Sequence, residues 1–174
     1  MMPRVLRLLR LNVAGLLAAL FVGERLALAA DSVREGPQLL RPAEHGVGRL
    51  IEPLVFTDID GRQHQLPDQS RANRLTVFCL TSTSCPLSRK YLPTVARLAA
   101  EAEAGVRFVC VNPIATDTAA SMAAAAATVP EAIYVHDPEG RLCQQLAATS
   151  TTDVVVLDAN RTVVYHGAVD DQYG

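Results

Sequence analysis

The chain has 174 residues, of which 49% are hydrophobic and 20% are charged, and its formal net charge is −2 at pH 7. The slightly acidic balance, without a basic cluster, argues against a nucleic-acid-binding protein. The cysteines, Cys79, Cys85, Cys110 and Cys143, are too few for a disulfide-stapled scaffold of this length.

Residues 1–30 are organised like an export signal. Three arginines lie within the first ten residues, residues 11–22 form an apolar run, and Ala27-Leu28-Ala29 offers the small residues that a signal peptidase requires. The apolar run is short for a membrane span. We therefore expect an exported protein, periplasmic or secreted. The sequence leaves open whether the segment is a cleaved signal peptide or an N-terminal membrane anchor.

The rest of the chain is expected to form an arm and one domain. Residues 31–48 are rich in glycine and proline and show little apolar periodicity, which is typical of a linker or arm. Residues 49–174 are long enough for a single domain with its own core. At the start of this domain, the alternation over residues 54–66 around Asp60-Gly61 predicts a β-hairpin.

Strands and helices alternate after this hairpin. The apolar runs and periodicities predict strands over 75–80, 106–112 and 132–136, helices over 86–104 and 116–128, a short helix carrying residues 143–146, and a closing hairpin of 154–157 and 162–166. Thr116 or Asp117 is expected to cap the alanine-rich helix. This order of elements predicts an α/β fold whose sheet begins parallel and ends antiparallel.

The segment Leu80–Ser88, which reads LTSTSCPLS, is the most informative stretch of the chain. A buried strand leads through a polar turn to Cys85, and Pro86 follows at the first position of the predicted helix, where its missing N–H would be unpaired anyway. Unpaired backbone N–H groups at the positive end of a helix lower the pKa of a nearby thiol. The pattern therefore predicts a thiol-based redox domain with Cys85 as its nucleophile.

This arrangement resembles the redoxin branch, including AhpC/TSA-like proteins, of the thioredoxin-like superfamily, and most of all its exported bacterial members. The resemblance extends from about Pro53 to Gly174. It is carried by the Asp58–Gly61 hairpin, the Cys-Pro helix start, the closing strands with Val155–Asp158 and Val164–Gly167, and the final Asp170–Gly174. It implies a thioredoxin-like fold with an N-terminal β-hairpin and a mixed central sheet flanked by helices.

One expected element of that fold has no counterpart in the sequence. A final helix normally covers one face of a thioredoxin-like sheet after the last hairpin, but no helical pattern follows His166. The domain is therefore expected to be truncated at its C-terminal end, or to receive this cover from a fused or partner domain.

The resemblance leaves the reaction open. Thioredoxin-type enzymes carry Cys-x-x-Cys, but Ser88 stands at the second position here, so a mixed disulfide cannot be resolved within the motif. Peroxiredoxins have a hydroxyl three residues before the cysteine, which Ser82 supplies, and a proline where Phe78 stands. Their activating arginine has no clear counterpart, although Arg89 or Lys90 places positive charge one helical turn away. Peroxiredoxin-like chemistry and thiol–disulfide exchange both remain possible.

Four further residues complete the predicted site. Ser82 and Ser88 are expected to hydrogen-bond the Cys85 sulfur. Thr152 lies in the region where thioredoxin-like folds place a cis-proline facing the active cysteine, so we expect its hydroxyl to face that sulfur instead. Cys143 is either a core residue of its short helix or a resolving thiol that meets Cys85 after local unfolding.

The remaining cysteines and histidines carry no predicted chemistry. Cys79 and Cys110 fall inside apolar strands, where cysteine is usually a small buried side chain. His136 and His166 end strands, but the cysteine spacing of copper-carrying relatives is missing, and we expect neither a metal nor another cofactor. The expected partners are an external thiol reductant or a disulfide-containing protein. The alternative function is a redox-inert binding or docking domain of a larger exported assembly, which the acidic Asp170-Asp171 and the missing final helix favour.

Overall fold

The computed structural model describes residues 41–67 and 72–170 of the chain. The predicted signal segment 1–30, the first part of the predicted arm and the last four residues lie outside the described residues. Within the two described ranges, no helix is both long and apolar enough to cross a membrane.

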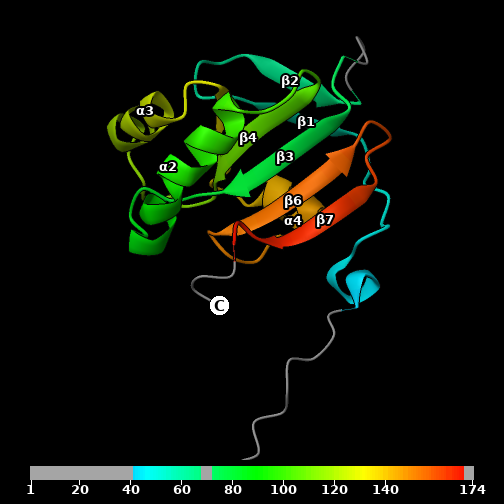
Figure 1. The fold of residues 1–174 in the computed structure, drawn as a ribbon. Helices are drawn as coiled ribbons and strands as arrows, with labels where there is room; N and C mark the ends of the chain where they lie inside the picture. Colours follow the sequence, from blue (N-terminus) through cyan, green and yellow to red (C-terminus); the bar gives the residue numbers. More distant parts are fainter. Residues whose placement is uncertain (1–40, 68–71, 171–174) are drawn as a thin grey trace, which may run out of the picture. The chain divides into compact units, whose positions relative to one another are not determined.

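A mixed sheet with the strand order β5-β4-β3-β6-β7 organises the domain (Figure 1). Its strands are β3 (Leu75–Leu80), β4 (Val106–Asn112), β5 (Ala132–His136), β6 (Asp153–Asp158) and β7 (Val163–Ala168). Strands β3, β4 and β5 run parallel to one another, whereas β6 runs antiparallel to both β3 and β7. The prediction of a sheet that begins parallel and ends antiparallel is confirmed. The predicted hairpin is present as a separate sheet of β1 (Leu54–Thr57) and β2 (Gln63–Leu66).

The helices divide between the two faces of the sheet. Helices α2 (Pro86–Ala100) and α3 (Ala119–Thr128) pack on one face, and α4 (Arg141–Leu146) packs with the β1–β2 hairpin on the other. Helix α2 ends at Ala100 rather than at the predicted Ala104, and the chain then turns into β4 through Gly105, whose φ of 90° suits glycine.

The start of α3 differs from the prediction. Its N-cap is Thr118, whose hydroxyl accepts a hydrogen bond from the N–H of Ser121, while the Ser121 hydroxyl accepts one from the N–H of Thr118. Thr116 and Asp117 were the predicted caps. Asp117 does not cap the helix because its carboxylate hydrogen-bonds the loop that precedes α2.

A short 3₁₀ helix, η1 (Pro42–His45), lies in the described part of the predicted arm. The N–H of Gly48 donates to the carbonyl of Val163 at 2.8 Å, and His166 Nδ1 lies 2.9 Å from the carbonyl of His45. Residues 42–48 are therefore attached to β7 rather than free of the domain.

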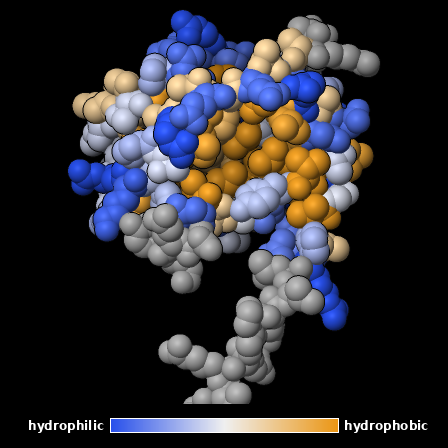
Figure 2. All heavy atoms as spheres, in the orientation of Figure 1, coloured by the Kyte–Doolittle hydropathy of each residue, from blue (hydrophilic) through white to orange (hydrophobic). Residues whose placement is uncertain are grey.

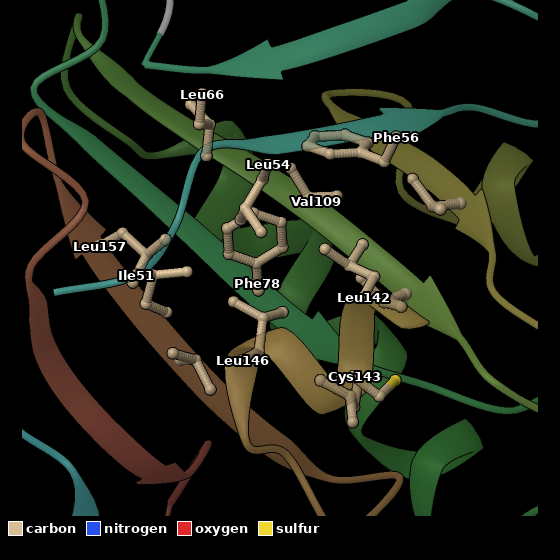
Figure 3. Close-up of a cluster of buried hydrophobic side chains, with 14 of the residues drawn as sticks. Ile51, Leu54, Phe56, Leu66, Phe78, Val109, Leu142, Cys143, Leu146 and Leu157 are labelled. Carbon is tan, nitrogen blue, oxygen red and sulfur yellow. The ribbon is translucent and has the colours of Figure 1, made fainter. Parts of the chain in front are cut away.

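The face of the sheet toward α4 carries the larger apolar core (Figure 3). Phe78, which is fully buried, lies at its centre and meets Phe56 edge-on, with ring centroids 5.9 Å apart. Leu142, Cys143 and Leu146 fill this core from α4. The hairpin and the short helix thus close one side of the sheet.

The opposite core lies under α2 and α3. Cys79 and Cys110 are 3% and 0% exposed there, which confirms their prediction as small buried side chains. They are direct neighbours across β3 and β4. Val95 of α2 and Met122 of α3 cover them from the helices.

Part of this second face has no helical cover among the described residues. Val77 and Val156 remain partly exposed at its surface, and a groove of about 590 Å³ runs beside the end of α2. The groove is lined by Arg74, Leu75, Leu98, Ala102, Glu103, Val106 and Phe108. Figure 2 shows hydrophobic residues gathered on this side of α2.

Candidate functional site: the Cys85 loop

Cys85 lies where β3 has ended and α2 begins. It is the N-cap residue of α2, with an extended backbone (φ −80°, ψ 118°), and Pro86 occupies the first helical position. Its carbonyl already accepts the first helical hydrogen bond, from the N–H of Arg89 at 3.1 Å. The side chain is partly exposed. The structure thus has this cysteine at a helix N-terminus, as predicted.

Hydrogen bonds lower the pKa of the Cys85 thiol. The largest contribution comes from the backbone N–H of Ser88, followed by the Thr151 hydroxyl, and the N–H of Leu87 adds to them against a small opposing effect of burial. The groups that stabilise the thiolate are thus two helix N–H groups and one hydroxyl. Cys85 combines an accessible sulfur with a stabilised thiolate, which is what a nucleophilic thiol requires.

The other three cysteines have the opposite character. Burial raises the pKa of Cys79 to about 12 and also raises the pKa of Cys110. Burial raises the pKa of Cys143 to about 12 as well, and the neighbouring Asp137 adds to this shift. Because only a thiolate attacks an electrophile readily, these opposite pKa shifts make Cys85 the candidate nucleophile among the four cysteines.

Ser82 and Ser88 shape the loop around this sulfur. The Ser82 hydroxyl accepts hydrogen bonds from the N–H of Ser84 (3.1 Å) and of Cys85 (3.2 Å), so it holds the backbone of the cysteine and not its sulfur. The Ser88 hydroxyl is buried, accepts from the N–H of Ser82 at 2.8 Å and lies 3.0 Å from Thr81 Oγ1. What Ser88 offers the sulfur is its backbone N–H.

The hydroxyl opposite Cys85 belongs to Thr151, whereas the sequence pointed to Thr152. The Thr152 hydroxyl lies 3.1 Å from Ser150 Oγ, and the N–H of Thr152 also donates to that oxygen. This local turn before β6 directs Thr152 back toward Ser150 and leaves Thr151 to reach the sulfur. The correct loop was predicted, but the residue was wrong by one position.

Asp117 is a site residue that the sequence did not reveal. Its Oδ2 accepts hydrogen bonds from the N–H of Thr83 (2.7 Å), from Asn112 Nδ2 (2.9 Å) and from the Ser82 hydroxyl (3.2 Å). Burial raises the pKa of Asp117, but the hydrogen bonds from Asn112 and Thr83 outweigh this effect and hold it well below its usual range. The available signal was its position just after β4, whose carboxyl end adjoins that of β3.

A second groove opens beside the loop, between α2 and α3. It has a volume of about 390 Å³ and is lined by Ser82, Thr83, Arg89, Leu92, Pro93, Ser121, Ala124, Ala125 and Thr128. Arg89, one of the two cations considered as activating residues, therefore borders this groove. Among the described residues, no group of three or more His, Cys, Asp or Glu side chains is placed to hold a metal ion.

Comparison with known proteins identifies the family. The redoxin family model matches residues 47–173, which is most of the chain. The chain belongs to the redoxin family. The prediction of a redoxin domain in the thioredoxin-like superfamily is confirmed.

Solved structures agree on the fold of this redoxin. An uncharacterised conserved protein from Geobacillus kaustophilus has a TM-score of 0.62 and 24% identity over 72% of this chain and 70% of its own. A thioredoxin-like protein from Aeropyrum pernix gives 0.58 and 18%, covering 68% and 82%. A secreted disulfide oxidoreductase from Mycobacterium tuberculosis gives 0.55 and 15%, covering 67% and 84%. At these identities the likeness establishes the thioredoxin-like fold alone. No curated protein matches the chain.

Cys143 is built into the core of the redoxin domain. It is 7% exposed within α4, and its N–H donates to Asp137 Oδ2 at 2.9 Å. To reach Cys85, its sulfur would have to leave the core together with part of α4. The resolving role considered for Cys143 therefore requires local unfolding of a helix that carries three buried side chains.

Proposed function

We propose that this redoxin catalyses thiol–disulfide exchange in an exported compartment, with Cys85 as its single active thiol. The observation that carries the proposal is the partly exposed Cys85 at the N-cap of α2, where hydrogen bonds from two N–H groups of α2 and from the Thr151 hydroxyl lower the pKa of its thiol. An available thiolate at this place attacks a disulfide in line with its S–S bond. Residues 1–30, with their leader pattern, support export.

The reaction takes place in two balanced steps. In the first, the Cys85 thiolate attacks one sulfur of a substrate disulfide, a mixed disulfide forms, and the other substrate sulfur leaves as a thiolate. In the second, the thiolate of an external thiol attacks the mixed disulfide and releases Cys85 as a thiolate again. The external thiol ends in a new disulfide with the substrate sulfur that Cys85 had held, so the external sulfur is oxidised while the substrate sulfur released in the first step is reduced, and Cys85 returns unchanged. An external thiol is needed because Ser88 replaces the second cysteine and Cys143 is buried.

The contacts of the Ser82 hydroxyl and the position of Arg89 favour disulfide exchange over peroxide reduction. The Ser82 hydroxyl, which a peroxiredoxin would direct at the sulfur, is hydrogen-bonded to backbone N–H groups instead. The described groups that lower the pKa of Cys85 are neutral donors, and Arg89 borders the groove between α2 and α3. None of the described cations contributes to the lowered pKa of Cys85, which suits the thiolate leaving group of a disulfide better than the more basic hydroxide that must leave a peroxide.

The test is the reactivity of Cys85 in the purified full chain. Alkylation by iodoacetamide is followed across pH for the wild type, Cys85→Ser and Cys143→Ser, and the protein is then exposed separately to glutathione disulfide and to hydrogen peroxide. We expect rapid labelling below the ordinary thiol pKa, lost in Cys85→Ser only, and a mixed disulfide with glutathione. Oxidation by peroxide with a bond between Cys85 and Cys143 would replace the proposal with that of a self-resolving peroxidase.

A redox-inert docking domain is the second candidate, and the uncovered apolar face beside α2 favours it. Leu98 is 38% exposed there, next to the groove that it lines with Leu75 and Phe108. Such a face suits a fused or partner domain. Slow labelling of Cys85 at its ordinary pKa, without any mixed disulfide, would support this function and contradict the enzyme.

A further inference from the structure

We propose that Asp117 is the positioning residue of the redox site: its carboxylate holds the Ser82–Cys85 loop so that the Cys85 sulfur stays at the N-terminus of α2. The proposal rests on Cys85 being the nucleophile, as proposed above. Asp117 acts through Ser82 and Thr83, and its part in the reaction is to fix where the sulfur lies.

The Asp117 carboxylate is held by a residue outside the Ser82–Cys85 loop. Asp117 is 8% exposed, and the Nδ2 of the fully buried Asn112 donates to it at 2.9 Å. Asn112 is held in turn by the N–H of Ile114, which donates to its Oδ1 at 2.9 Å. Asn112 is the last residue of β4, an interior strand of the sheet, and Asp117 lies in the loop that follows it. The carboxylate that anchors the Cys85 loop is therefore tied through Asn112 to a strand of the sheet.

Two hydrogen bonds connect this anchor to the loop. The N–H of Thr83 donates directly to Asp117 Oδ2 at 2.7 Å. The Ser82 hydroxyl donates to the same oxygen at 3.2 Å, which leaves its lone pairs to accept from the N–H groups of Ser84 and Cys85. A hydroxyl has one proton, so its donation to Asp117 decides that Ser82 acts as an acceptor toward Cys85.

A carboxylate suits this position better than a neutral side chain. Three donors converge on one oxygen, and hydrogen bonds to an ionised acceptor are about twice as strong as those between neutral groups. Asparagine would keep one acceptor oxygen at Asp117 but would lose the charge, and alanine would leave the donors of Thr83 and Asn112 unsatisfied. The loop should loosen progressively from aspartate to asparagine to alanine.

The order of the variants at position 117 distinguishes a positioning role of Asp117 from a purely electrostatic one. A carboxylate near a thiolate disfavours the thiolate, so an electrostatic role alone would make both neutral variants more reactive than the wild type. If Asp117 positions the loop, its removal lets the sulfur move away from the N–H groups of Ser88 and Leu87, and reactivity falls. The two roles thus predict changes of opposite sign.

The experiment measures iodoacetamide alkylation of Cys85 in the full chain at a fixed pH below its thiol pKa. We expect a roughly threefold lower rate for Asp117→Asn and a roughly tenfold lower rate for Asp117→Ala, because a smaller fraction of the thiol is ionised at that pH. Asp137→Asn is the matched control. Asp137 is equally buried (8% exposed) and accepts the N–H of Cys143 at the start of α4, so its loss should lower stability without changing the rate.

Amide hydrogen exchange gives a second readout that does not depend on reactivity. The N–H groups of Thr83 and Cys85 should exchange faster in Asp117→Ala than in the wild type or Asp137→Asn. If amide exchange at Thr83 and Cys85 is unchanged in Asp117→Ala, and the alkylation rate of Cys85 is unchanged or raised, the role of Asp117 is overturned. This holds even where the wild type is fully active. A wild-type Cys85 that is alkylated no faster than an ordinary thiol would instead refute the proposed function. The role of Asp117 in holding the loop would then be tested by the amide exchange rates alone.

Discussion

Replacing Thr151 by valine tests the geometry of the thiolate most directly. Valine keeps the shape of threonine and removes only the hydroxyl that hydrogen-bonds the Cys85 sulfur. A hydrogen bond to a charged group contributes about 1.5–3 kcal/mol when it is protected from water. Because Cys85 and Thr151 are both partly exposed, screening by solvent reduces this to about 1 kcal/mol. The pKa of Cys85 should therefore rise, and at a pH below that pKa its thiolate fraction should fall about fivefold, which corresponds to about 1 kcal/mol.

The matched control is Thr152→Val, in the neighbouring residue. Its hydroxyl lies beside Ser150 Oγ, so its removal should leave the pKa of Cys85 unchanged. The assay is the pH dependence of iodoacetamide alkylation for the wild type and both variants. Equal pKa values for the wild type and Thr151→Val, or a larger shift in Thr152→Val, would refute the assignment of Thr151 and return the role to the residue named from the sequence.

The same perturbation has a stability effect of known sign. The pKa of Cys85 is lower in the folded state than in the unfolded chain, so its ionisation stabilises the fold above the ordinary thiol pKa. This stabilisation is lost as pH falls through the folded-state pKa. The difference in free energy of unfolding between the wild type and Thr151→Val should therefore be largest at alkaline pH and vanish at acidic pH, as urea unfolding across pH would record.

Three further predictions concern the fold, and urea unfolding checks each of them. Leu146→Ala empties a fully buried position of the core under α4 and should destabilise the domain by about 2–5 kcal/mol, whereas the half-exposed Leu98→Ala should cost much less. Thr118→Ala removes the capping box of α3 and should cost about 1 kcal/mol. Burial raises the pKa of Asp58, but its bond to His64 Nε2 at 2.8 Å and its backbone donors outweigh this and lower it. Asp58→Asn should therefore reduce stability near neutral pH, and the loss should shrink as pH falls through the folded-state pKa of Asp58.

The bounds of the three parallel strands could be predicted to the residue because their sequences are nearly continuous apolar runs. β3, β4 and β5 begin and end where the sequence predicted, and β4 lies between two parallel neighbours, where both faces are buried. Helix ends were less certain. The boundary of α2 is set by where its last turn meets the loop before β4, and the N-cap of α3 depended on whether Asp117 served the helix or a distant loop.

The placement of Cys85 followed from local signals alone. A strand, a polar turn and a Cys-Pro pair are contiguous in sequence, and the backbone conformation of an N-cap follows from them. The hydroxyls of Ser82 and Ser88 were correctly assigned to this loop, but their targets were not. Which atom a serine hydroxyl bonds depends on rotamers and on competing donors, and sequence spacing does not encode these.

Asp117 and Thr151 illustrate a different limit of sequence reasoning. The carboxyl ends of the parallel strands β3 and β4 meet at one edge of the sheet, and the start of the antiparallel β6 returns to that same edge. Residues far apart in the chain thus converge on Cys85, with Asp117 holding its loop and Thr151 facing its sulfur. The sheet topology predicts which loops converge, but the side chain that each loop directs inward is decided by turns such as the one between Ser150 and Thr152. A mutational scan of these two loops should therefore change Cys85 reactivity more than a scan of α2 itself, whose N–H groups any residue except proline supplies.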